Sequence, residues 1–146
     1  MTDTVLVDDH NLLRLLLDDE PEGLRAAGTG IATTGLWYHR LCRAVSDQTV
    51  VGLMSRRLGG LDPKATANII GAVVDLPSDV ELISLRSLGW PMGELVRGGV
   101  RLNLLALEAL AAAQFLNAEI CLAAANDNPP LVAAARTAGI AMRRLA

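Results

Sequence analysis

The stretch VLVDDHNLLRLLL (residues 5–17) decides the fold. A short run of aliphatic residues ends at two aspartates, and a leucine-rich run follows them. We predict a buried strand over residues 4–7 and a helix from about residue 9 to residue 18. Asp8, Asp9 and His10 lie at the junction, where they are candidates either for a metal site or for the start of the helix.

Strands and helices are predicted to alternate along the rest of the chain. Short β-branched and aliphatic runs indicate strands, and apolar residues three and four positions apart indicate helices. A helix that begins at Pro63 has Asp62 as its N-cap and ends before Pro77. The other predicted strands cover residues 30–35, 80–84, 118–124 and 140–145, and the other predicted helices cover residues 36–45, 48–58, 91–97, 102–116 and 131–138.

This alternation predicts an α/β fold, a three-layer α/β/α sandwich around a mostly parallel sheet of four to five strands. No internal repeat or linker interrupts the pattern, which indicates a single domain over residues 1–146. Ligands of such sheets collect beyond the carboxyl ends of the strands, near the point where the strand order reverses. Asp8 and Asp9 follow the first predicted strand, so they are placed for a site.

Composition limits the classes of function. Hydrophobic residues make up 51% of the chain and aromatic residues only 3%, which predicts an aliphatic core, and the net charge of −3 does not favour general nucleic-acid binding. No apolar run approaches the roughly 20 residues that span a bilayer, and no signal-peptide pattern is present. Cys42 and Cys121 fit no metal spacing. We therefore expect a cytoplasmic protein with no membrane segment.

Both ends of the chain resemble the PIN domain, the small α/β fold of many bacterial ribonucleases. VLVDDHNLL (residues 5–13) is similar to the family's opening strand, which ends in an aspartate, and to the leucine-rich helix after it. RLNLLALEALAAAQFLNAEICLAAANDNPPLVAAARTAGIAM (residues 101–142) is similar to the family's closing half, with residues 117–118 at its Gly-Ala turn and residues 139–140 at its final glycine and strand. The resemblance implies a PIN-like fold and a homodimer, because PIN domains commonly pair.

PIN ribonucleases gather three or four carboxylates around one or two Mg²⁺ or Mn²⁺ ions, which prefer oxygen ligands and activate water. The resemblance places the first acid at Asp8 and the fourth at Asp127 or Asn126. The second position holds His39, and the third holds Ala106.

Two residues near the third position are polar but out of register. Asn103 precedes Ala106, and Glu108 lies two residues after it, about 200° around the helix. Only two of the four family positions are therefore acidic. The resemblance with these departures implies a degraded metal centre at Asp8 and Asp127.

Our main hypothesis is a PIN-like domain with a degraded acidic centre that acts mainly through protein or RNA binding, with little or no nuclease activity. An antitoxin-like protein is one expected partner. The alternative is an active Mg²⁺- or Mn²⁺-dependent endoribonuclease, the toxin of a toxin–antitoxin pair, which would use Asp8 and Asp127 with Asp9, Glu108 or His39. A third hypothesis is a structural subunit of a homo-oligomer.

Each candidate residue also has a structural interpretation. Asp8, Asp9 and Asp127 lie at the starts of predicted helices, so each is a candidate N-cap. His39 follows Trp37 and Tyr38, which favours a packing role for a half-buried imidazole.

Overall fold

A parallel β-sheet of five strands forms the centre of the protein, as the computed structural model of the chain describes it for residues 3–25, 29–46 and 59–145. The strand order is β3-β2-β1-β4-β5, and every neighbouring pair is parallel, which confirms the predicted sheet. The strands are β1 (Thr4–Val7), β2 (Gly30–Thr34), β3 (Val80–Ile83), β4 (Glu119–Ala123) and β5 (Met142–Leu145).

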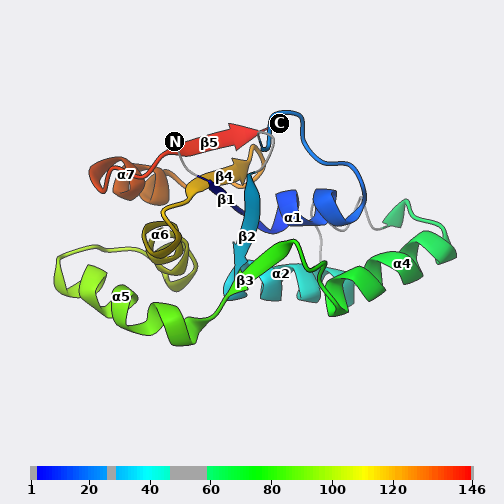
Figure 1. The fold of residues 1–146 in the computed structure, drawn as a ribbon, viewed down its shortest axis with the longest axis horizontal. Coiled ribbons are helices and arrows are strands. Elements are labelled where there is room, and N and C mark those ends of the chain that lie inside the picture. Colours follow the sequence, from blue (N-terminus) through cyan, green and yellow to red (C-terminus); the bar gives the residue numbers. More distant parts are fainter. Residues whose placement is uncertain (1–2, 26–28, 47–58, 146) are drawn as a thin grey trace.

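Helices cover both faces of this sheet and complete the three-layer sandwich (Figure 1). One face carries α1 (Asp9–Leu16), α2 (Gly35–Ser46) and α4 (Pro63–Val74), and the other carries α5 (Leu85–Arg97), α6 (Leu104–Leu116) and α7 (Pro129–Thr137). In the described parts of the chain, none of these helices has the length and apolar character needed to cross a membrane.

Burial on both faces of the sheet explains why the three buried residues of the opening strand, Val5–Val7, are all apolar. Val5 and Val7 pack into the cluster on the α1 side, whereas Leu6 packs into the cluster around α6. Helix α6 is strongly apolar, and every residue from Ala106 to Ala113 is buried.

The sheet topology places the carboxyl ends of β1 and β4 at a switch point. From β1 the chain moves through β2 to β3 on one side of the sheet, and β4 then pairs with the other side of β1. A crevice for ligands is expected where strand order reverses in this way. Asp8, which follows β1, and residues 124–128, which follow β4, lie at this point.

Two predicted helix starts were wrong. Helix α5 begins at Leu85 and contains Pro91, although proline is most common in the first turn. Leu88 and Met92 lie four positions apart and are both buried, so packing of this face extends the helix in front of the proline. Helix α7 begins at Pro129, because the preceding residue supplies the N-cap.

The strongest predicted helix start was correct. Asp62 is the N-cap of α4 and accepts a hydrogen bond from the Ala65 N–H at 2.7 Å, with Pro63 as the first helical residue. The helix predicted over residues 48–58 lies outside the described residues.

Candidate functional site

Asp8 is held at the switch point by three N–H donors. Its Oδ1 accepts from the Asn11 backbone at 2.9 Å, which makes Asp8 the N-cap of α1. Its Oδ2 accepts from the Ala123 backbone and from the Asn126 side chain, each at 2.8 Å. The carboxylate is fully buried, and it joins the ends of β1 and β4. A carboxylate has about four acceptor positions, so most of those on Asp8 are already used.

Asp9 is buried beside Asp8 and faces a cation from the chain itself. Its Oδ1 accepts from the Asn126 amide at 2.8 Å, so this amide bridges the two aspartates. Its Oδ2 lies 3.1 Å from Nε of Arg40 on α2. This contact is an ion pair without hydrogen-bond alignment, so Asp9 Oδ2 has no hydrogen bond among the described residues. Asp9 is the first residue of α1, and its expected role as the N-cap was wrong because Asp8 fills it.

The environment of Asp8 affects its proton affinity. Burial raises the pKa of Asp8 above its ordinary value of 3.8, and the N–H donors of Asn11, Ala123 and Asn126 oppose this rise. The neighbouring charge of Asp9 adds a smaller upward contribution. Desolvation of the charged form is therefore the dominant influence.

Glu108 is also fully buried, but it serves a different helix. Its Oε1 accepts from the Leu36 backbone N–H at 2.8 Å, at the start of α2. Its Oε2 has no hydrogen-bond partner among the described residues. Beside it, the Thr34 hydroxyl accepts from the Trp37 N–H at 3.2 Å. The carboxylate and the hydroxyl together cap the start of α2 at the carboxyl end of β2.

Asp127 is exposed to solvent, unlike the buried Asp8. The residue before it, Asn126, donates a hydrogen bond to Asp8. The Asp127 side chain is 61% exposed, and its Oδ1 lies 3.8 Å from Nη1 of Arg144 on β5. It does not cap α7, contrary to its structural interpretation. Asn128 does so, by accepting from the Leu131 N–H at 3.2 Å.

The other two family positions contribute no carboxylate. His39 is exposed on α2, so the expected half-buried packing role was wrong. Ala106 is buried in the first turns of α6, and its backbone N–H donates to the side chain of Asn103, the N-cap of that helix.

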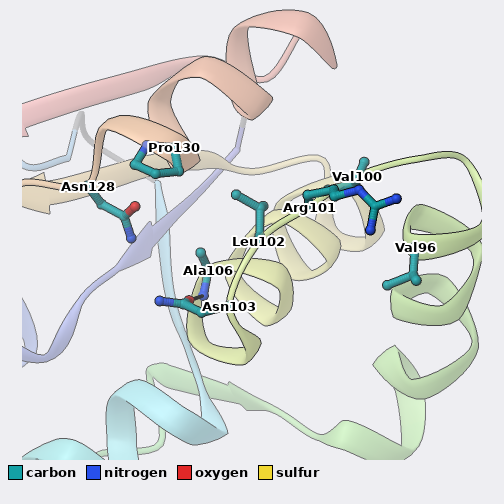
Figure 2. Close-up of a pocket in the computed structure, with 8 residues that line it drawn as sticks. All are labelled: Val96, Val100, Arg101, Leu102, Asn103, Ala106, Asn128 and Pro130. Atoms are coloured by element: carbon teal, nitrogen blue, oxygen red, sulfur yellow. Dashed lines mark hydrogen bonds between the residues drawn. The ribbon is translucent and has the colours of Figure 1, made fainter.

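Two adjoining cavities open at this end of the sheet. One, of about 310 Å³, is lined by Trp37, Arg40, Asn126 and Asp127 among others. A second, of about 420 Å³, shares Asn103, Asn128 and Pro130 with the first. Figure 2 shows the starts of α6 and α7 on opposite sides of this second cavity. The first cavity is lined by Arg40 and Asn126, whose side chains contact the buried aspartates.

The donors around the aspartates do not suit a divalent ion. In the described parts of the chain, no three His, Cys, Asp or Glu side chains gather closely enough to hold a metal. Asp8 and Asp9 are surrounded by N–H groups, and the guanidinium of Arg40 lies against the one carboxylate oxygen of this pair that has no hydrogen bond. A metal ion requires free oxygen ligands and is repelled by a nearby cation. The arrangement therefore does not fit the Mg²⁺ or Mn²⁺ that the resemblance implies.

Sequence reasoning missed Arg40 as part of this centre. Arg40 and Asp9 lie on different helices, 31 positions apart in the sequence, and no local spacing links them. The only available signal was its position next to His39, where the resemblance places the second acid.

Comparison with known proteins supports the fold. No protein-family profile and no curated protein sequence matches the chain. Among solved structures, it is similar to a chain of VapBC2 from Rickettsia felis, crystallised bound to a DNA fragment from their promoter. The TM-score is 0.56, the sequence identity is 14%, and the match covers 98% of this chain and 99% of that chain. At this identity the likeness is to the fold alone, and the five-stranded parallel sheet between two helical layers matches a PIN-like fold.

Proposed function

We propose that this chain is a PIN-like domain that acts by binding a partner and cuts RNA little or not at all. One observation supports this proposal most strongly. The buried pair Asp8 and Asp9 is compensated by N–H donors and by the guanidinium of Arg40.

This arrangement conflicts with metal-dependent phosphodiester hydrolysis. In that chemistry a carboxylate-bound ion generates hydroxide and stabilises the charge that develops on the phosphate. The ion needs several oxygen ligands with free lone pairs. Asp127 is the fourth acid of the family pattern, and its carboxylate lies beside Arg144 with more than half of its surface in solvent. The carboxylates that the resemblance assigns to the site thus have cationic partners or N–H donors.

A protein partner is favoured over RNA by the surface of the domain. Large apolar side chains are exposed on α4, β3 and α5, among them Val74, Leu82, Leu85 and Trp90, and the side chains of Trp90 and Val74 are 80% and 77% exposed. Apolar surface is typical of protein contacts where it is contiguous, and Leu82 and Leu85 lie close together in the sequence, on the edge strand β3 and at the start of α5. The net charge of −3 adds no attraction for phosphates.

We therefore propose that the partner is an antitoxin-like protein, and that the chain forms a homodimer in the cytoplasm. The similar fold in VapBC2 from Rickettsia felis supports the antitoxin-like partner. The homodimer rests on the sequence resemblance to PIN domains. Sedimentation of the purified protein tests the homodimer, because a strictly monomeric profile would contradict it.

An active Mg²⁺- or Mn²⁺-dependent ribonuclease is the second candidate. Two buried carboxylate oxygens, Asp9 Oδ2 and Glu108 Oε2, have no hydrogen bond among the described residues. They favour this candidate because each has lone pairs that a metal ion could use. It would require Arg40 to leave Asp9 and Asp127 to turn away from Arg144.

Incubation of the purified protein with structured RNA in Mg²⁺ or Mn²⁺ tests the two candidates. The proposal predicts no cleavage above the level of Asp8→Asn, which serves as the matched control. Cleavage by the unmodified chain that disappears in Asp8→Asn would refute the proposal and establish the ribonuclease. Equal cleavage by both proteins indicates a nuclease contaminant and therefore agrees with the proposal.

A further inference from the structure

The carboxylate of Asp9 is a buried anion that needs a compensating cation. Its exposed fraction is 0%, and its Oδ2 has no hydrogen bond among the described residues. Burial of an uncompensated carboxylate is strongly unfavourable, because the charge loses its hydration. The nearest cationic atom in the described structure is Nε of Arg40, at 3.1 Å.

Arg40 approaches Asp9 from the side of the solvent. Its side chain is 42% exposed, and it lines the cavity of about 310 Å³ together with Asn126 and Asp127. The guanidinium thus contacts a buried carboxylate oxygen that has no hydrogen bond among the described residues, while its own side chain reaches the cavity and solvent.

We propose that the guanidinium of Arg40 is the resident cation of this centre and takes the place of a divalent metal ion. Its removal would leave Asp8 and Asp9 as two adjacent carboxylates next to the cavity of about 310 Å³ that Arg40 lines. Because a like charge no longer repels the ion and Asp9 Oδ2 becomes accessible, the pair would then bind Mn²⁺. This inference deepens the proposed function and rests on it, since it names the side chain that keeps a metal out.

Binding of Mn²⁺ alone, without RNA, tests the inference. The variants are Arg40→Gln and Arg40→Met, and the matched control is Arg43→Gln, which removes an exposed arginine from the same helix. Free Mn²⁺ is measured by electron paramagnetic resonance, and the Mn²⁺-dependent shift of the unfolding temperature is measured on the same samples. We expect the unmodified chain and Arg43→Gln to bind with a Kd on the order of 1 mM or weaker. Arg40→Gln and Arg40→Met should bind about ten-fold more tightly.

A second substitution locates the ion. Asp9→Asn in the Arg40→Gln background should return the affinity to that of the unmodified chain, because it removes one of the two carboxylates. The inference is overturned if the folded Arg40 variants bind Mn²⁺ no more tightly than the Arg43→Gln control. It is also overturned if the unmodified chain already binds as tightly as the variants.

The unmodified protein provides a measurement that does not depend on folding of the variants. In its NMR spectrum, the backbone amides of Asn11 and Ala123, which donate to Asp8, should lose no more intensity than exposed amides elsewhere when Mn²⁺ is added well below the expected dissociation constant. Loss of intensity that is centred on these two amides and their neighbours would place the ion at Asp8 and overturn the inference. Failure of this inference can be told from failure of the proposed function. Mn²⁺ binding by the unmodified chain would overturn the role of Arg40, whereas RNA cleavage that disappears in Asp8→Asn would refute the proposed function.

Discussion

The backbone N–H of Leu36 donates to the buried carboxylate of Glu108 at 2.8 Å, across 72 positions of the sequence. This contact fixes the start of α2 against the central helix α6, at the carboxyl end of the sheet. Negative charge at the first turn of a helix interacts favourably with the free N–H groups there. Glu108 is thus a structural residue of the site's framework, although the resemblance made it a candidate metal ligand.

Replacement of Glu108 should destabilise the protein according to how much of this cap is lost. Glu108→Ala leaves the partly buried Leu36 N–H without its acceptor, so we expect the free energy of unfolding to fall by about 1–3 kcal/mol. Glu108→Gln keeps an acceptor oxygen and should lose less. Urea denaturation measures both variants against Glu94→Ala, which removes an exposed ion pair with Arg97 and should change stability by less than about 0.5 kcal/mol. Equal losses for Glu108→Ala and Glu94→Ala would contradict the capping role.

Substitutions of the adjacent residues Asp127 and Asn128 test which of them caps the start of α7. Asn128 is the N-cap, so Asn128→Ala should reduce the free energy of unfolding by about 1 kcal/mol. Asp127→Ala should have a much smaller effect, because among the described residues its exposed side chain makes only a long contact, at 3.8 Å, with Arg144. Thermal or urea unfolding of the two variants distinguishes these roles, and a larger loss for Asp127→Ala would show that the cap is assigned to the wrong residue.

The raised pKa of Asp8 predicts a specific pH dependence of stability. Because burial raises this pKa in the folded state, the folded chain binds the Asp8 proton more tightly than the unfolded chain does. The contribution of Asp8 to the free energy of unfolding should therefore fall as the pH rises from 3.8, the ordinary pKa of Asp8, through its raised pKa in the folded chain. The contribution should be constant at pH values below and above that window.

Asp8→Asn isolates this contribution, since asparagine does not titrate. The measured quantity is the difference in free energy of unfolding between the unmodified chain and Asp8→Asn, at a series of pH values. We expect the unmodified chain to lose stability relative to the variant as pH increases through the window. A difference that is independent of pH would show that the donors of Asn11, Ala123 and Asn126 offset desolvation, and a change in the opposite direction would show that they outweigh it.

The two free cysteines should react at very different rates. Cys121 is buried on β4, and burial raises the pKa of its thiol to about 11, so almost no thiolate is present at neutral pH. Cys42 is partly exposed on α2. A thiol reagent at pH 8 should therefore modify Cys42 first, and Cys121 should react only as the chain unfolds. Mass spectrometry of Cys42→Ser gives the control, and rapid labelling of that folded variant would contradict the buried position of Cys121.

The fold could be predicted from the sequence because its signals are local. The apolar run of β1, the N-cap and proline at Asp62–Pro63 and the strand-then-helix alternation each depend on a few adjacent residues. Those signals gave the parallel sheet and placed Asp8 at the end of its strand. The start of α5 was missed because the rule for proline is also local, and tertiary packing of Leu88 and Met92 outweighs it.

The chemistry of the site could not be predicted in the same way. Three contacts define it: Arg40 with Asp9, Asn126 with both aspartates, and Glu108 with the start of α2. Each contact joins segments that are far apart in the sequence, so none leaves a spacing pattern. The resemblance placed Asn126 near the fourth acid position, but only the folded arrangement shows that its amide bridges the buried pair.

A Mn²⁺ soak of crystals of the unmodified protein, followed by an anomalous difference map, tests the central claim most directly. The claim is that N–H donors and a guanidinium compensate the buried aspartates, so that no divalent ion is held there. We predict no anomalous peak at the carboxylates of Asp8 and Asp9, and Nε of Arg40 still in contact with Asp9 Oδ2. A peak bonded to Asp8 and Asp127, with Arg40 displaced, would contradict the claim.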